Sequence, residues 1–143
     1  MFFIYLALLV YFLFFAEEYG RQQLGIGEYR YNLVPFTEIR RFWIYREQVG
    51  VFAAFLNLAG NVVGFMPFGF LLPVMSEGRR RFRATVPLGF LLSLGVEVIQ
   101  LFTRVGSFDV DDLLLNTLGV ILGYLLFLIL NRIRRSWDHG KKV

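Results

Sequence analysis

Four apolar stretches constrain the fold of this chain more than any other feature. They cover Phe2–Ala16, Val51–Met75, Thr85–Phe102 and Leu113–Leu130. A helix needs about 20 mostly apolar residues to cross the roughly 30 Å of a bilayer's hydrocarbon core. The second stretch can cross with a tilt, the third and fourth can cross with their polar ends among the head groups, and the first is the shortest. We predict an all-α, four-helix transmembrane bundle that forms one domain over residues 1–143.

The basic residues predict how this bundle is oriented. Four arginines crowd the connection between the second and third stretches, from Arg79 to Arg83, and five further basic residues follow Leu130. Short loops rich in lysine and arginine stay in the cytoplasm. With four spans, both termini then lie in the cytoplasm, and Glu17–Gly50 and Thr103–Asp112 lie outside. We therefore expect a multi-pass protein of the cell membrane.

Three of the stretches carry polar or small residues at helical spacing. Residues three and four positions apart lie on one face of a helix. The three faces consist of Asn57, Asn61 and Gly64; of Ser93, Glu97, Gln100 and Arg104; and of Asp112, Asn116, Gly119 and Gly123. Polar side chains are costly in hydrocarbon and turn toward a bundle's interior or a wet cavity. We predict one polar pocket in the outer half of the membrane, with the binding residues Asn57, Asn61, Glu97, Gln100, Arg104, Asp112 and Asn116.

Glycines and a proline predict local features of the helix backbones. The pairs Gly60–Gly64 and Gly119–Gly123 have the spacing that allows transmembrane helices to approach closely. Pro67 lies inside the second stretch and removes a backbone donor there, which predicts a kink or a break.

Glu97 is an ionisable residue within a span, and such residues are by default functional candidates. It is a candidate catalytic residue or a polar contact for a ligand. The alternative is a structural lock, in which Glu97 pairs with Arg104 or Arg30.

Three aspartates precede the fourth stretch. Asp109 or Asp111 can cap that helix, because acidic side chains suit a helix N-terminus. Asp112 shares the face of Asn116, and Asp109 lies on that face one turn earlier. We predict that Asp109, Asp112 or both point toward Glu97 and the third stretch. Asp111 lies about 100° away, so it should face the membrane interface or cap the fourth helix.

The outer loop contains the motif NLVPF, with Asn32, Pro35 and Phe36 as candidate site residues. It is either a turn before a short helix or a lid or re-entrant segment that folds over the pocket. The following TEIRRFWIYREQ predicts a helix with Thr37 as its N-cap. Its apolar face has the pattern of a helix lying in the membrane interface. That face consists of Phe36, Ile39, Phe42 and Trp43.

Composition excludes several kinds of chemistry. The chain has no cysteine, and its single histidine, His139, lies in the basic tail. A Ser-His-Asp triad or a zinc site on the outer side is therefore excluded. No phosphate-binding glycine motif or nucleic-acid-binding pattern is present. We predict no cofactor, no metal site and no nucleic-acid partner.

Four motifs follow one another between Asn32 and Tyr124. They are NLVPF, NLAGNVVGFMPFGFLLP from Asn57, GFLLSLGVEVIQLF from Gly89, and RVGSFDVDDLLLNTLGVILGY from Arg104. This order resembles the VanZ-like family of bacterial membrane proteins. The resemblance implies an integral membrane protein of the bacterial envelope. The family is named for a protein that gives low-level resistance to teicoplanin, a glycopeptide antibiotic, so the name implies a phenotype and no mechanism.

Three hypotheses follow for function. The first is a protein that binds or handles an amphiphile in the outer polar pocket: a lipid, a lipid-linked cell-wall precursor or a lipoglycopeptide. The second is a membrane-embedded enzyme that uses Glu97 with Asp109 or Asp112 on a lipid-linked substrate. The third is a structural or partner-binding protein in which the polar residues form a lock. Membrane lipids are expected partners in each case, and the sequence leaves the oligomeric state open.

Overall fold

The computed structural model describes residues 2–16, 31–45, 47, 51–76, 81–104 and 107–140. The elements in chain order are α1 (Phe2–Tyr11), the π-helical turn η1 (Phe12–Ala16), β1 (Tyr31–Asn32), α3 (Thr37–Ile44), α5 (Val51–Met75), α6 (Phe82–Thr103), β2 (Phe108–Asp109) and α7 (Val110–Gly140). The structure is predominantly helical, as predicted. It adds one feature that the sequence analysis missed, which is a short parallel pairing of β1 with β2.

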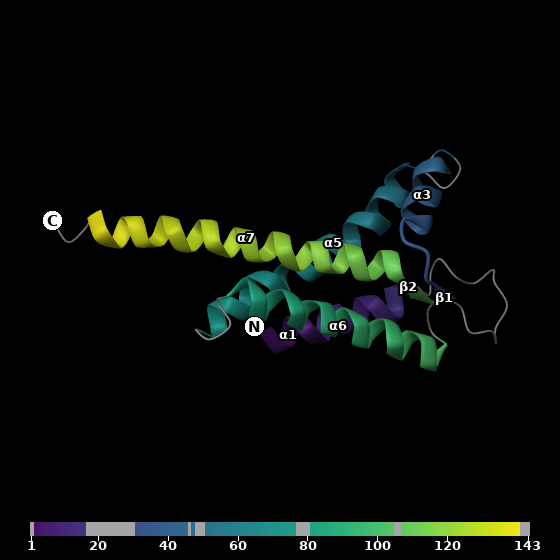
Figure 1. The fold of residues 1–143 in the computed structure, drawn as a ribbon, viewed down its shortest axis with the longest axis horizontal. Helices are drawn as coiled ribbons and strands as arrows, with labels where there is room; N and C mark the ends of the chain where they lie inside the picture. Colours follow the sequence, from purple (N-terminus) through teal and green to yellow (C-terminus); the bar gives the residue numbers. More distant parts are fainter. Residues whose placement is uncertain are drawn as a thin grey trace.

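The long helices run back and forth along one direction (Figure 1). The N-terminus, the last turn of α5 and the C-terminus lie toward one end of the bundle, and α3, β1 and β2 lie toward the other (Figure 1). We call this second end the α3 end. This course matches the predicted order of spans, and it brings the NLVPF segment next to the beginning of α7.

Three helices in the described part of the chain are long and apolar enough to cross a membrane. The qualifying segments are Leu58–Met75, Phe82–Thr103 and Val110–Trp137. The first predicted span is shorter, with an apolar helix over Phe2–Phe14. At 1.5 Å per residue its length falls short of roughly 30 Å, so a fourth complete crossing stays a prediction.

Glycines bring the backbones of α5 and α7 into direct contact. A Cβ atom added to Gly119 would lie 2.1 Å from the carbonyl oxygen of Val62, and one added to Gly123 would lie 1.9 Å from that of Met66. The predicted close approach at Gly119 and Gly123 is confirmed. The prediction for the other pair holds only at Gly64: a Cβ atom there would lie 3.5 Å from the Leu9 side chain of α1, whereas one at Gly60 would meet nothing within 4 Å. A small residue at four-residue spacing permits contact only where a neighbouring helix lies against that face.

Val120 of α7 fills the centre of the bundle and is fully buried. Its carbonyl oxygen lies 2.0 Å from where a Cβ atom of Gly69 would stand, and its side chain lies 2.5 Å from that position at Gly89. Val120 thus occupies space that glycines leave open on both α5 and α6. The same core contains Leu9, Phe65, Phe68 and Leu72, so α1 packs against it as well.

Several helix ends and turns differ from the sequence-based expectations. α7 continues ten residues beyond Leu130, because no proline or glycine interrupts the basic tail before Gly140. α5 runs unbroken through Pro67, so the predicted break is absent. α3 begins with Thr37 as its first helical residue, and the N-cap position is Phe36. The prediction that Thr37 caps this helix is therefore wrong, since its hydroxyl donates instead to the carbonyl oxygen of Val34.

Gly123→Ala should destabilise the folded protein by about 1–3 kcal/mol, because the added methyl group must displace the backbone of α5. The matched control is Gly60→Ala, where the space is open and alanine is the better helix former. Thermal unfolding in detergent, followed by circular dichroism, measures both variants. An unchanged melting temperature for Gly123→Ala would contradict the close contact between α5 and α7.

Candidate functional site

Buried polar side chains gather at the α3 end of the bundle. They come from α6, from β2 and from the first turns of α7, and each is less than a tenth exposed. We call the following set the polar cluster: Ser93, Glu97, Asp109, Asp111 and Asn116. The structure thus brings together Glu97, Asp109 and Asn116 among the residues that the sequence singled out, on the elements that were expected to carry them.

Asp109 connects three segments of the chain. Its backbone N–H donates to Glu97 Oε2 at 3.0 Å, and its Oδ1 accepts the backbone N–H of Asp111 at 2.8 Å. The second bond is the geometry of an N-cap, which places Asp109 at the beginning of α7 as its capping residue. Oδ1 also accepts from Asn32 Nδ2 at 3.3 Å, within the β1–β2 pairing where Asn32 stands opposite Asp109.

Glu97 lies close to the N-terminus of α7 as a result. It is 3% exposed, although it is an ionisable side chain within a span. The positive end of a helix dipole and an N–H donor both stabilise a carboxylate. The backbone of Asp109 and the carboxylate of Glu97 are thus joined between the two helices, while the carboxylate of Asp109 accepts from Asp111 and Asn32. That this carboxylate points toward Glu97 stays a prediction.

Asp111 has a role that the sequence did not reveal. It is fully buried, and its two carboxylate oxygens accept the backbone N–H groups of Phe36 and Ile39. These N–H groups belong to the N-cap and third positions of α3, which have no partners within that helix. A residue 75 positions away therefore caps α3. The prediction that Asp111 faces the membrane interface or caps the fourth helix is wrong.

The NLVPF segment forms the turn that presents these N–H groups. Asn32 Oδ1 accepts the N–H of Val34 at 3.1 Å, which is the hydrogen bond of an Asx turn. Phe36 then takes a left-handed conformation with φ of 66°, and α3 follows at once. Of the two readings of this motif, the structure supports the turn before a short helix.

Asp112 lies at the edge of the polar cluster and is partly exposed. Its Oδ1 accepts a hydrogen bond from Asn61 Nδ2 on α5. We had predicted contact with the third span, α6. The difference arises because α7 lies between α5 and α6, so one stripe of its surface is shared between two neighbours. The side chain of Asn57 lies outside the described residues.

Asn116 forms the inner layer of the cluster. Its Nδ2 donates to Ser93 Oγ on α6 at 2.9 Å, and Asn116 itself is 1% exposed. Its Oδ1 is buried and has no hydrogen-bond partner in the described part of the chain. A buried acceptor without a partner costs roughly 1–3 kcal/mol, so this position has an unused capacity to accept a hydrogen bond.

Gln100 and Arg104 lie beyond Glu97, toward the end of α6. Gln100 Nε2 donates to the carbonyl oxygen of Leu13 in η1 at 2.9 Å, so it fastens α6 to the first helix. Arg104 is exposed and ends α6 in a left-handed conformation with φ of 57°. The stripe on α6 therefore diverges as the helix nears its end, with Glu97 facing α7 and Gln100 facing η1.

Metal ligands do not assemble among the described residues: no group of three or more histidine, cysteine, aspartate or glutamate side chains could hold an ion there. The carboxylates of Asp109, Asp111 and Asp112 each accept hydrogen bonds from N–H groups of the protein.

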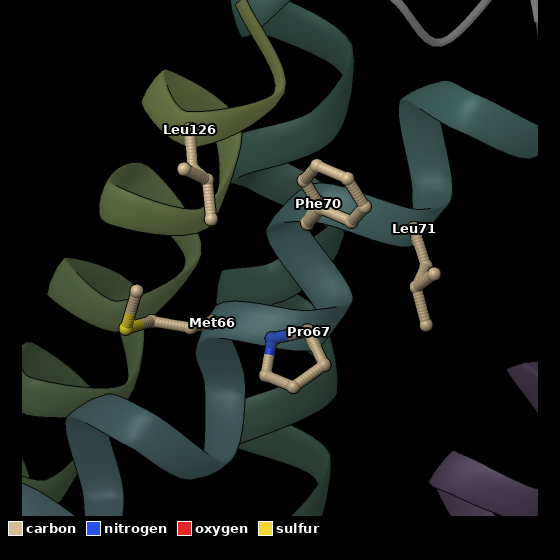
Figure 2. A pocket seen from close by; sticks show the side chains of 5 residues that line it. All are labelled: Met66, Pro67, Phe70, Leu71 and Leu126. Carbon is tan, nitrogen blue, oxygen red and sulfur yellow. The ribbon is translucent and has the colours of Figure 1, made fainter. Parts of the chain in front are cut away.

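A separate hollow of about 260 Å³ lies between α5 and α7 (Figure 2). It is entirely apolar, and the side chains that line it are Met66, Pro67, Phe70, Leu71 and Leu126. The residues of α5 in this hollow lie closer to its C-terminal end than Asn61 does. It is therefore distinct from the polar pocket that the sequence predicted, and that pocket stays a prediction.

Two contacts of the cluster were beyond the reach of the sequence patterns. Ser93 was on the predicted stripe, and its spacing of four from Glu97 marked the face, but nothing identified it as the partner of Asn116. One feature of the sequence pointed to the contact of Asp111 with α3. Phe36 precedes the helix and has no side chain that can cap it, so the first turn of α3 needed an acceptor from elsewhere.

The apolar helices and the buried polar cluster define a helical membrane protein. The sequence profile of the VanZ/LLP1 family matches residues 2–131, and the chain belongs to this family. It is 31% identical over 132 residues to Protein VanZ of Enterococcus faecium, a match covering 90% of this chain and 72% of that protein. No solved structure matches the chain. The resemblance based on the four motifs is confirmed.

Asp111→Asn should loosen α3 by about 2 kcal/mol, the scale of a hydrogen bond to a charged group. An asparagine can accept one of the two N–H groups but presents its own N–H₂ to the other. Thr37→Ala is the control, because Thr37 was the predicted cap and its hydroxyl bond is exposed. Limited proteolysis and hydrogen exchange of residues 36–44 report the change. Equal protection in the two variants would rule out capping by Asp111.

Proposed function

We propose that this VanZ-family protein binds the polar head of an amphiphile at the α3 end of its bundle, in the outer half of a bacterial membrane. The ligand is a lipid, a lipid-linked cell-wall precursor or a lipoglycopeptide, and teicoplanin is the lipoglycopeptide to test. The observation that carries the proposal is the burial of Glu97 within a span. It is joined by the buried amide oxygen of Asn116, which has no hydrogen-bond partner among the described residues.

The chemistry of the cluster favours a ligand with hydrogen-bond donors. Glu97, Asp109 and Asp112 are carboxylates that lie within one end of the bundle, and each already receives an N–H donor. A hydroxyl or ammonium group of a lipid or sugar head is the complementary partner for such acceptors. The hydrocarbon tail of such a ligand would extend alongside the apolar surfaces of the helices.

The enzyme hypothesis uses the same residues with a different outcome. Glu97 would act as acid or base, with Asp109 or Asp112 as its partner. Incubation of purified protein with radiolabelled envelope lipid separates the two proposals, because a binder retains the lipid unchanged and an enzyme releases a labelled product.

Glu97→Gln should abolish saturable lipid binding and any teicoplanin resistance while the protein stays folded. A glutamine can still accept the N–H of Asp109, so this variant removes the charge and keeps the structural bond. Glu47→Gln removes an equal charge from an exposed position and is the control. Binding is measured by native mass spectrometry, and resistance by growth of a sensitive host at equal membrane expression. Full activity of Glu97→Gln in a folded protein would contradict the proposal, and loss of folding would support the lock.

The orientation is tested with cysteines, since the chain has none of its own. Ser76→Cys lies just after α5 and Ser107→Cys lies just before β2, at opposite ends of the bundle. We expect an impermeant maleimide to label Ser107→Cys in intact cells and to label Ser76→Cys only after the membrane is opened. Labelling of Ser76→Cys from outside would reverse the orientation and move the polar cluster to the cytoplasmic half.

A further inference from the structure

We infer that the segment around α3 is a lipid-docking surface that lies in the head-group region of the bilayer and that Asp111 positions it there. The surface consists of Tyr31, Leu33, Val34, Phe36, Arg40 and Trp43. This inference does not rest on the ligand proposed for the polar cluster.

Large apolar side chains on this surface are exposed. Phe36 is 63% exposed and Trp43 is 68% exposed, and Tyr31, Leu33 and Val34 are each more than half exposed. Patches of this kind on a protein mark an interaction surface. They are also close together in the chain, since they occupy the strand, the turn and the short helix that follow one another.

The residue types favour the membrane interface over the hydrocarbon core. Arg40 and Trp43 are three residues apart and so share one face of α3, and Phe36 directly precedes this helix. Tryptophan, tyrosine and arginine are the side chains that collect at head-group depth, where aromatic rings meet apolar chains and cations meet phosphates. Arg41 is a second exposed arginine of the same helix.

The position of α3 fixes the depth of this surface. The carboxylate of Asp111 holds the N–H groups of Phe36 and Ile39, and Asp111 is the second residue of α7. The first turn of α3 therefore lies level with the end of a membrane-spanning helix. α3 also leans away from the axis of the bundle (Figure 1), so its exposed face is turned toward the surroundings of the protein.

A second copy of the chain is the less suitable occupant. A symmetric dimer through this surface would enclose Arg40 of both copies in one interface, where like charges close together are unfavourable. Lipid phosphates instead complement the arginines.

The test uses the depth of Trp43 in the bilayer. The chain has two tryptophans, so Trp137→Phe leaves Trp43 as the sole tryptophan in the full-length protein. The variant is placed in vesicles of phosphatidylcholine and phosphatidylglycerol that contain brominated lipids. We expect the strongest quenching from bromines near the glycerol end of the acyl chains, and weaker quenching from bromines near the chain ends. Quenching that is strongest at the chain ends, or absent together with free access of aqueous iodide, would overturn the inference.

Asp111→Asn in the same background tests the positioning role. We expect it to reduce the shallow quenching of Trp43 and to shift its emission to longer wavelength, whereas Thr37→Ala leaves both unchanged. A parallel Asp111→Asn variant that carries Trp43→Phe and keeps Trp137 shows whether the bundle stays intact in the membrane. Quenching that is unaffected by Asp111→Asn would remove Asp111 from the inference, and quenching that falls as the protein is concentrated would assign the surface to a second copy.

Discussion

Acidic side chains accept hydrogen bonds from backbone N–H groups at the beginnings of α7 and α3. These N–H groups have no partners within their own helices. Where such groups are buried away from water, each one left uncapped would cost roughly 1–3 kcal/mol. Glu97 accepts the N–H of Asp109, Asp109 accepts that of Asp111, and Asp111 accepts those of Phe36 and Ile39. The acidic residues before the long apolar helix therefore serve first to accept hydrogen bonds from the backbone N–H groups at the buried ends of helices.

This chain of acceptors is held in place by the packing of α7. The glycines of α5 and α7 allow backbone contact, and Val120 fills the space left open on both sides. The beginning of α7 can then be placed accurately enough for Glu97 on α6 and Asn61 on α5 to reach it. The function that we propose depends on this precision, because the same carboxylates that cap the helices form the polar end of the predicted binding site.

Local patterns in the sequence predicted the elements better than their long-range partners. Apolar length gave the helices, and helical spacing gave the buried face with Glu97 and Asn116, since both depend on residues close together in the chain. The contact of Asp111 with α3 joins residues more than 70 positions apart, and no periodicity encodes it. Asp112 bonds Asn61 of the predicted pocket, on α5 and not on α6, and Gln100 bonds η1, because a helix with partners on several sides divides one polar stripe among them.

The inner boundary of the polar cluster limits how a ligand can reach it. Asn116 and Ser93 form its deepest polar layer, and one turn further along α7 the side chain of Val120 packs against Gly89 without room for an added methyl group. A polar head group that approached from the far end of the bundle would have to displace this contact and lose its own hydration. In the proposed function a ligand enters from the α3 end, where Asn32 and Asp112 are partly exposed and the turn before α3 is exposed. The Oδ1 atom of Asn116 is itself buried, so a head group reaches this acceptor only when those groups move aside.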